Sequence, residues 1–176
     1  SYLATNLDIL HNRTFDSAEQ HGIYVSNSRV TNDNIVVRGN MVYGNHQNGI
    51  QFNGDCEVGG DGVIGNSVIE ANRIYDNGYK GLSLISMSNS RVSNNIIYEN
   101  GVRGGAGGIH LTDQPGCGNP SRYNEVFNNT LYEPRIAAIR LTDAANNNTL
   151  FNNIAVSGTP VADEVGGNQI DSSSNL

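Results

Sequence analysis

Short stretches of alternating apolar and polar residues recur along the whole chain, with glycine, asparagine and aspartate between them. The clearest example runs from Asn72 to Leu84, where Asn-x-Ile-Tyr-x-Asn-Gly is followed after a short gap by Gly-Leu-x-Leu. Alternation with a period of two is typical of short β-strands, and Gly, Asn and Asp tolerate the left-handed conformations of sharp turns. Because neither strand can bury a face alone, we expect copies of this unit to stack.

The unit returns with a period of about 30 residues. The second piece of the unit is named the glycine-type strand, because glycine begins all copies but the last, which begins with Ala138. Its copies start at residues 22, 49, 81, 108 and 138, at intervals of 27, 32, 27 and 30 residues. The first piece of the unit, which begins with asparagine, is named the asparagine-type strand. A third apolar stretch precedes each copy of it, at Val30–Val37, Val63–Ile69, Arg91–Ser93, Tyr123–Phe127 and Thr149–Phe151. Three short strands per repeat with no helix between them predict an all-β fold, a parallel β-helix solenoid of about five to six coils.

Stacked coils place equivalent residues above one another at the strand spacing of about 4.8 Å. We therefore expect the asparagines that open the asparagine-type strands to form a ladder of side-chain amides along the axis. The members of this ladder are Asn40, Asn72, Asn95, Asn129 and Asn153. Two aliphatic columns are expected to fill the interior: Ile23, Ile50, Leu82, Ile109 and Ile139, and Val25, Phe52, Leu84, Leu111 and Leu141.

Residues 1–176 are long enough for one sizeable core, so a single domain is expected. The chain starts at Ser1 with a stretch that already resembles part of a coil, and no amphipathic capping helix precedes Asn12. An open solenoid end exposes strand edges and core side chains. We expect either that a longer chain continues this domain or that a partner chain pairs with the open end.

The composition excludes several classes of protein. Charged residues make up 15% of the chain and hydrophobic residues 37%, with 21 glycines and no tryptophan, and no run of helix-forming residues is present. An Asn- and Gly-rich composition is also typical of disorder, but the fixed places of the apolar residues favour a core. The net charge of −7 argues against a nucleic-acid partner, and the lack of a long apolar run argues against a membrane partner.

Cys56 and Cys117 both lie in glycine-rich loops just after a glycine-type strand. Stacking would bring these loops out on the same side of the solenoid, two coils apart. We favour a disulfide between them, and two free thiols are the alternative.

One face of the glycine-type strands carries the candidate functional residues. Alternation turns Ile23 and Val25 inward and Tyr24 outward. The outward column is then Tyr24, Gln51, Ser83, His110 and Arg140, and a second column two residues on contains Ser26, Asn53, Ser86 or its neighbour, Thr112 and Thr142. Amides and hydroxyls bond sugar hydroxyls, Arg and Lys pair with carboxylates, and Tyr stacks on a ring, so the face suits an acidic polysaccharide. A solvated sheet face without a ligand is the alternative.

The motifs His21-Gly22-Ile23-Tyr24-Val25, Asn40-Met41-Val42-Tyr43 and Asn48-Gly49-Ile50-Gln51-Phe52 resemble repeats of the right-handed parallel β-helix proteins of the pectate-lyase-like superfamily. Similar repeats occur in alginate C5-epimerases and polysaccharide lyases. The resemblance covers the whole chain and implies a right-handed solenoid, an extracellular or periplasmic location, and a polymer such as alginate or pectin. The Asp-Pro-His-Glu run of the epimerases has no counterpart here, so we take catalytic candidates from the outward face.

Lyases and epimerases of this kind abstract the C5 proton of a uronic acid after its carboxylate has been neutralised. We predict Lys80 or His110 as the base, Arg140 or Arg135 as the neutralising cation, and Tyr24 as a proton donor. The catalytic set is Lys80, His110 and Arg140, and the substrate-binding set is His21, Tyr24, Gln51, Asn53, Ser83 and Arg135.

Asp113 and Asp143 end equivalent Leu-Thr-Asp runs on neighbouring coils, a placement that suits a bound Ca²⁺ or two loop-capping carboxylates. No other cofactor is predicted. Glycoside hydrolysis by paired carboxylates, non-catalytic carbohydrate binding, and a structural role in an adhesin or phage-tail fibre remain alternatives.

Overall fold

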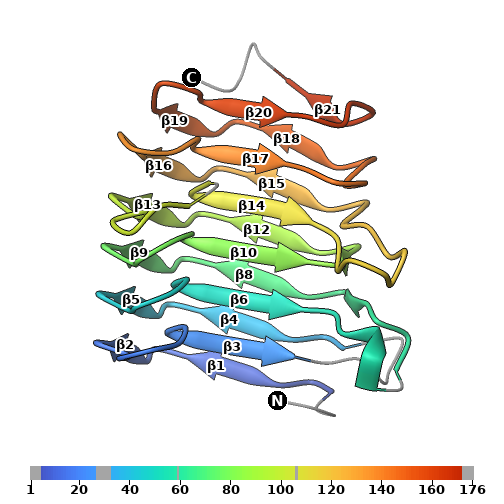
Figure 1. Cartoon of the computed structure of the whole chain (residues 1–176), viewed down its shortest axis with the longest axis horizontal. Coiled ribbons are helices and arrows are strands. Elements are labelled where there is room, and N and C mark those ends of the chain that lie inside the picture. Colours follow the sequence, from blue (N-terminus) through green and yellow to red (C-terminus); the bar gives the residue numbers. More distant parts are fainter. Residues whose placement is uncertain (1–4, 27–32, 59, 106, 172–176) are drawn as a thin grey trace.

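The computed structural model describes residues 5–26, 33–58, 60–105 and 107–171. Its strands form rungs that stack from the N-terminal to the C-terminal end of the chain (Figure 1). Three parallel sheets run the length of this stack; each of six coils contributes one strand to each sheet, and β21 adds a seventh strand to the first sheet. The parallel β-helix predicted from the repeats is therefore confirmed.

The first sheet contains β1 (Asp8–Leu10), β4 (Val36–Arg38), β8 (Val68–Glu70), β12 (Arg91–Ser93), β15 (Glu125–Phe127), β18 (Thr149–Phe151) and β21 (Gln169–Ile170). The second contains β2 (Arg13–Phe15), β5 (Met41–Tyr43), β9 (Arg73–Tyr75), β13 (Ile96–Tyr98), β16 (Thr130–Tyr132) and β19 (Ile154–Val156). The third contains β3 (Ile23–Ser26), β6 (Ile50–Asn53), β10 (Leu82–Ile85), β14 (Ile109–Thr112), β17 (Ile139–Leu141) and β20 (Val161–Asp163). A small additional sheet pairs β7 (Ile64–Gly65) with β11 (Met87–Ser88), and a short 3-10 helix, η1, spans Cys56–Val58.

The interior is filled by the two predicted aliphatic columns of the third sheet together with the central residues of the other two sheets. Phe52, Leu82 and Leu111 are completely buried, and Ile23, the most accessible of the predicted core residues, is 7% exposed. Burial of each such side chain contributes about 1.5–3 kcal/mol, so these columns supply the main driving force for stacking.

Glycine precedes the first four strands of the third sheet, β3, β6, β10 and β14, because the coils approach one another closely there. A Cβ on Gly81 would lie 2.7 Å from the carbonyl oxygen of Gly108 on the next coil and 2.7 Å from Cγ2 of Ile97. A side chain at this position would therefore force the coils apart.

The corners between the first and second sheets combine a left-handed residue with a ladder asparagine. At these six corners the left-handed residue has φ between 54° and 67°, and an asparagine follows it directly; the six are His11, Gly39, Ala71, Asn94, Asn128 and Asn152. Within the ladder, the backbone N–H and Nδ2 of Asn72 both donate to Oδ1 of Asn95, each at 3.0 Å. The same pair of bonds links the other predicted members and also Asn12. The predicted asparagine ladder is confirmed and is one rung longer.

Two further ladders were not predicted. One links Asn45, Asn77 and Asn100 and ends on the carboxylate of Glu133. The other consists of Ser67, Ser90, Asn124, Asn148 and Asn168. The signal for the first lies in the sequence, because an asparagine recurs five residues after Asn40, Asn72 and Asn95.

Three strand predictions for the first sheet were too long. Within Tyr123–Phe127, Tyr123 adopts φ 58° and β15 starts only at Glu125. The described strand within Val30–Val37 is β4, which starts only at Val36, and residues 30–32 lie outside the described residues. The stretch Val63–Ile69 is divided between β7 and β8 because Asn66 adopts φ 52° and turns the chain.

Candidate functional site

The first outward column of the third sheet is assembled as predicted. Strand pairing aligns Ser83 with Gln51 on one side and His110 on the other, and the column continues to Tyr24 and Arg140. Tyr24 is 46% exposed, whereas Ser83 and His110 are 0% and 6% exposed. The prediction of a polar column open to solvent is therefore wrong at its centre, where the short Ser83 side chain stands between longer neighbours.

The second outward column contains an aliphatic residue. Ile85, and not Ser86, pairs with Asn53 and Thr112, while Ser86 adopts φ 53° and is buried. Asn53 and Thr112 are themselves buried, so this column also offers less polar surface than the sequence indicated.

Lys80, His110 and Arg140, the predicted catalytic set, act on one another electrostatically. Burial first, and then the charges of Lys80 and Arg140, lower the pKa of His110 to about 3. Burial and Arg140 also lower the pKa of Lys80, and burial and Lys80 lower that of His21. His110 is consequently a neutral imidazole at neutral pH with cations beside it. Arg140 also forms an ion pair with Glu164, with 2.7 Å between Nε and Oε1.

A chain of hydrogen bonds ties His110 to the next coil. Its Nε2 lies 2.8 Å from Oγ1 of Thr142. Thr142 Oγ1 donates to Oδ2 of Asp143 at 2.9 Å, and the hydroxyl of Thr112 donates to the same oxygen. These two hydroxyl donors are the main reason why the pKa of Asp143 is lowered. The carboxylate thus organises both threonines around the imidazole.

Three buried polar atoms on this face have no hydrogen-bond partner among the described residues: Oδ1 of Asn53, Oγ of Ser83 and Nδ1 of His110. They lie on three successive coils, β6, β10 and β14. Buried polar atoms are normally paired, because leaving one unpaired costs about 1–3 kcal/mol. Their concentration on one face marks a place where water or polar groups of another molecule can complete the bonding.

The predicted binding residues of the first coils also lie together. The rings of His21 and Tyr24 stack with centroids 5.4 Å apart, and Asn53 Nδ2 donates to the Tyr24 hydroxyl at 3.1 Å. Gln51 Oε1 accepts a bond of 2.6 Å from Asn48 Nδ2. Arg135, by contrast, is exposed in the loop that precedes β17, beside a separate hollow that Gly158 and Thr159 also line.

The two candidate calcium ligands have different surroundings. Asp143 holds the two threonine hydroxyls described above, whereas Asp113 is half-buried at the end of β14. No cluster of three or more His, Cys, Asp or Glu side chains that could hold a metal ion occurs within the described ranges. The calcium site therefore stays a prediction that depends on these two aspartates.

Cys56 and Cys117 form a disulfide with their Cα atoms 5.7 Å apart, which confirms the predicted bridge. It joins the loop after β6 to the loop after β14, and Asn119 Nδ2 reinforces the junction by donating to the carbonyl of Asp61 at 2.9 Å. The tied loops stand at the ends of the strands that carry Asn53 and Thr112, next to the second outward column.

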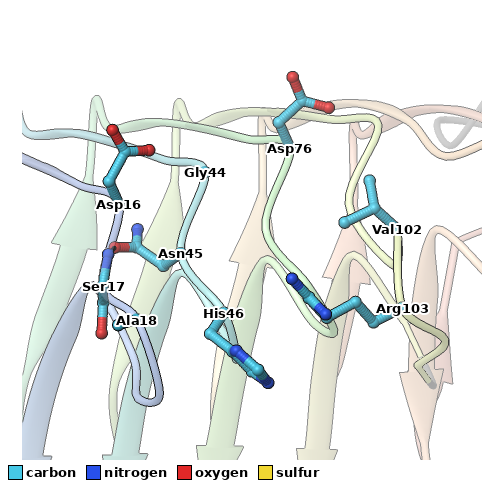
Figure 2. Close-up of a pocket in the computed structure, with 9 residues that line it drawn as sticks. All are labelled: Asp16, Ser17, Ala18, Gly44, Asn45, His46, Asp76, Val102 and Arg103. Atoms are coloured by element: carbon cyan, nitrogen blue, oxygen red, sulfur yellow. Dashed lines mark hydrogen bonds between the residues drawn. The ribbon is translucent and has the colours of Figure 1, made fainter.

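A notch of about 250 Å³ lies away from this face, at the corner that follows the second sheet (Figure 2). It exists because Gly44 has no side chain between Asp16 and Asp76, which occupy the same position on the adjacent coils. Both carboxylates point to one side, and His46 and Arg103 lie below them (Figure 2). None of the predicted site residues lines this notch.

The comparisons with known proteins identify the class of fold. The family model described as a right handed beta helix region matches residues 5–175. The chain belongs to this family of right-handed β-helix proteins, in agreement with the predicted resemblance. No curated protein sequence matches the chain, and no helix in the described part of the chain is both long and apolar enough to cross a membrane.

Three solved structures share the fold. The mannuronan C-5 epimerase AlgE4 A-module of Azotobacter vinelandii is 15% identical with a TM-score of 0.76, and the AlgE6 A-module of the same organism is 18% identical with a TM-score of 0.71. A mutant tailspike protein of E. coli bacteriophage HK620, in complex with a pentasaccharide, is 12% identical with a TM-score of 0.50. These matches cover 95%, 100% and 99% of this chain but only 45%, 54% and 39% of the other chains. At these identities the likeness shows the fold alone.

Sequence reasoning missed the part that Thr142 and Asp143 play beside His110. Thr142 was assigned to the second outward column and Asp143 to a calcium site, with no link to the imidazole. The repeated Leu-Thr-Asp run at 111–113 and 141–143 was the available signal, since stacking it on adjacent coils brings hydroxyls and a carboxylate together.

Proposed function

We propose that the outer face of the third sheet binds an acidic polysaccharide, such as alginate or pectin, and abstracts the C5 proton of a uronic acid residue. The observation that carries this proposal is the neutral His110, which has an unpartnered Nδ1 and lies between cationic side chains. A carboxylate-bearing sugar complements the cations, and the unpartnered acceptors complement its hydroxyls.

The chemistry follows from the roles of the charged groups. Lys80 and Arg140 neutralise the sugar carboxylate, which makes the neighbouring C5 proton acidic enough to remove. With the bound carboxylate compensating the charges of Lys80 and Arg140, His110 takes this proton and becomes an imidazolium. Lys80, whose pKa is lowered, then supplies a proton either to C5, which gives epimerisation, or to the C4 oxygen as the C4–O bond breaks, which gives a lyase reaction.

Tyr24 has a binding role in this proposal. It lies three strand pairings from His110, a separation of about 14 Å at the usual strand spacing of about 4.8 Å. That is too far for proton donation to the same sugar. Tyr24, stacked on His21, and Gln51 therefore bind neighbouring sugars of the chain.

The Cys56–Cys117 disulfide supports an extracellular or periplasmic location, because such bonds persist in oxidising compartments. We also propose, independently of the reaction, that Asp113 and Asp143 bind Ca²⁺. Comparing turnover with and without a chelator tests it.

The experiment is incubation with alginate, pectin and a neutral chitin-type polymer. Ultraviolet absorbance reports unsaturated uronides from a lyase, and proton NMR of the polymer reports epimerisation. Lys80→Ala, His110→Ala and Arg140→Ala are each expected to lower turnover about 100-fold or more, without loss of the circular dichroism spectrum. Asp8→Asn, on the first sheet, is the matched control. Full turnover in all three site variants would refute the assignment.

Non-catalytic binding of the same polymers is the second candidate. It is favoured by the burial of Ser83 Oγ and His110 Nδ1, because a sugar must displace neighbouring side chains to reach them. Binding by calorimetry without any new absorbance or epimerisation would identify this function.

A further inference from the structure

The hydrogen bonds around His110 determine which of its ring nitrogens carries the proton. Nε2 lies 2.8 Å from Thr142 Oγ1, and Nδ1 has no partner within the described part of the chain. A neutral imidazole has one donor and one acceptor nitrogen, and a threonine hydroxyl can either donate or accept. The contact alone therefore fits both tautomers.

The nearby carboxylate decides between them. The hydroxyls of Thr112 and Thr142 are both bonded to Oδ2 of Asp143. A carboxylate is a stronger acceptor than a neutral imidazole, so each hydroxyl proton goes to Asp143. The Thr142 oxygen then has only lone pairs to offer His110, and Nε2 must be the donor.

We propose that Asp143, acting through Thr142, holds His110 as the Nε2–H tautomer and so leaves Nδ1 as the proton acceptor of this face. Asp143 and Thr142 are positioning residues, since neither is required to touch the sugar. The tautomer follows from the hydrogen bonds alone, whereas its use in proton abstraction rests on the proposed function.

The alternative tautomer would disable the base. Without the Asp143 carboxylate, the Thr142 hydroxyl has two acceptors left, His110 Nε2 at 2.8 Å and Thr112 Oγ1 at 3.2 Å. Donation to the nearer Nε2 moves the ring proton to Nδ1. Nδ1–H has no lone pair with which to accept a C5 proton. Before a uronate binds, burial and the charges of Lys80 and Arg140 disfavour a second ring proton, so the resting ring is neutral and carries its one proton on Nδ1.

The direct test is nitrogen NMR of the histidine rings in ¹⁵N-histidine-labelled protein at neutral pH. His110→Gln identifies the signals of His110 among the four histidines. We expect Nδ1 of His110 at the shift of an unprotonated nitrogen and Nε2 at that of a protonated one. In Asp143→Ala, the Nδ1 shift should move by more than half of the gap between these two positions.

Two threonine variants keep the test informative if Asp143→Ala does not fold. Thr142→Val has nearly the same shape but lacks the oxygen, so both tautomers should be populated. Thr142→Ser retains the hydroxyl and should restore the pattern of the unmodified protein. Asp8→Asn is the control for nonspecific changes.

An Nδ1–H tautomer in the unmodified protein would overturn the proposal, and so would an unchanged tautomer in both Asp143→Ala and Thr142→Val. The catalytic meaning has its own measurement. If the protein turns over uronate polymers, Thr142→Val should lower kcat at least 10-fold, and Thr142→Ser should recover most of it. An Nε2–H tautomer in a protein without turnover would refute the proposed reaction and leave the positioning intact.

Discussion

The ladder of Asn45, Asn77 and Asn100 ends on Glu133, so a carboxylate stands where the earlier coils have an asparagine. The side chain is completely buried. Its Oε2 accepts the backbone N–H of Asn100 at 2.9 Å, and its Oε1 accepts Asn100 Nδ2 at 2.8 Å. Burial outweighs these bonds and raises the pKa of Glu133 from 4.5 to about 7. We predict that Glu133→Gln stabilises the protein at alkaline pH and not at acidic pH.

The direction of the pH effect on stability follows from the difference in the pKa of Glu133 between the folded and unfolded protein. Because the folded protein holds the proton more tightly than the unfolded chain, the stabilisation is complete below pH 4.5 and is lost as the pH rises through about 7. The shift from 4.5 to about 7 corresponds to at most about 3 kcal/mol, since one pKa unit is worth about 1.4 kcal/mol. Glutamine avoids this loss and can accept both Asn100 bonds through one oxygen, as Asn129 does for Asn95. We expect a gain of about 2 kcal/mol at pH 8 and almost none at pH 4.5.

Urea unfolding followed by far-ultraviolet circular dichroism between pH 4.5 and 8.5 measures this difference, and the chain has no tryptophan to report by fluorescence. Asp33, with a pKa raised to about 6, titrates in the same window in both proteins, so it cancels in the comparison. Glu19→Gln, at an exposed position, is the control. A stability difference that stays constant across the pH range would refute the linkage.

Three further predictions concern the scaffold. Asn95→Ala should lower the free energy of unfolding by about 3–5 kcal/mol in urea titrations, because it leaves several buried ladder groups unpaired; a loss under 1 kcal/mol would contradict this. Ala71→Asn should stabilise by about 0.5–1 kcal/mol, since Ala71 has φ 54° and asparagine tolerates that region; calorimetry showing a lower Tm would contradict it. Replacing Cys56 and Cys117 by serine should cost about 2–4 kcal/mol, because the bridge spans 61 residues; an unchanged urea midpoint would contradict it.

The fold was predictable because each coil repeats the same local chemistry. In each glycine-type strand, the Ile or Leu that follows the opening residue faces the interior. Because side chains alternate along a strand, this assigns every other residue of the strand to the inner or the outer face. The lengths of the first-sheet strands were less predictable. Asn66 ends a strand through a left-handed backbone conformation, and asparagine occurs both at such corners and in the ladders, so the residue type alone does not distinguish the two places.

The candidate site was predictable only as a set of columns. The repeats placed Ser83, His110 and Arg140 on one face in the correct order, because strand register follows from the interior columns. They could not show which outward side chains are buried, since that depends on the length of neighbouring side chains and on the loops that rise beside the sheet. Whether His110 donates or accepts depends in turn on a hydroxyl and a carboxylate from the next coil. A site of this kind is defined by contacts between repeats, and for that reason its acid–base chemistry follows from the hydrogen bonds and not from the motif.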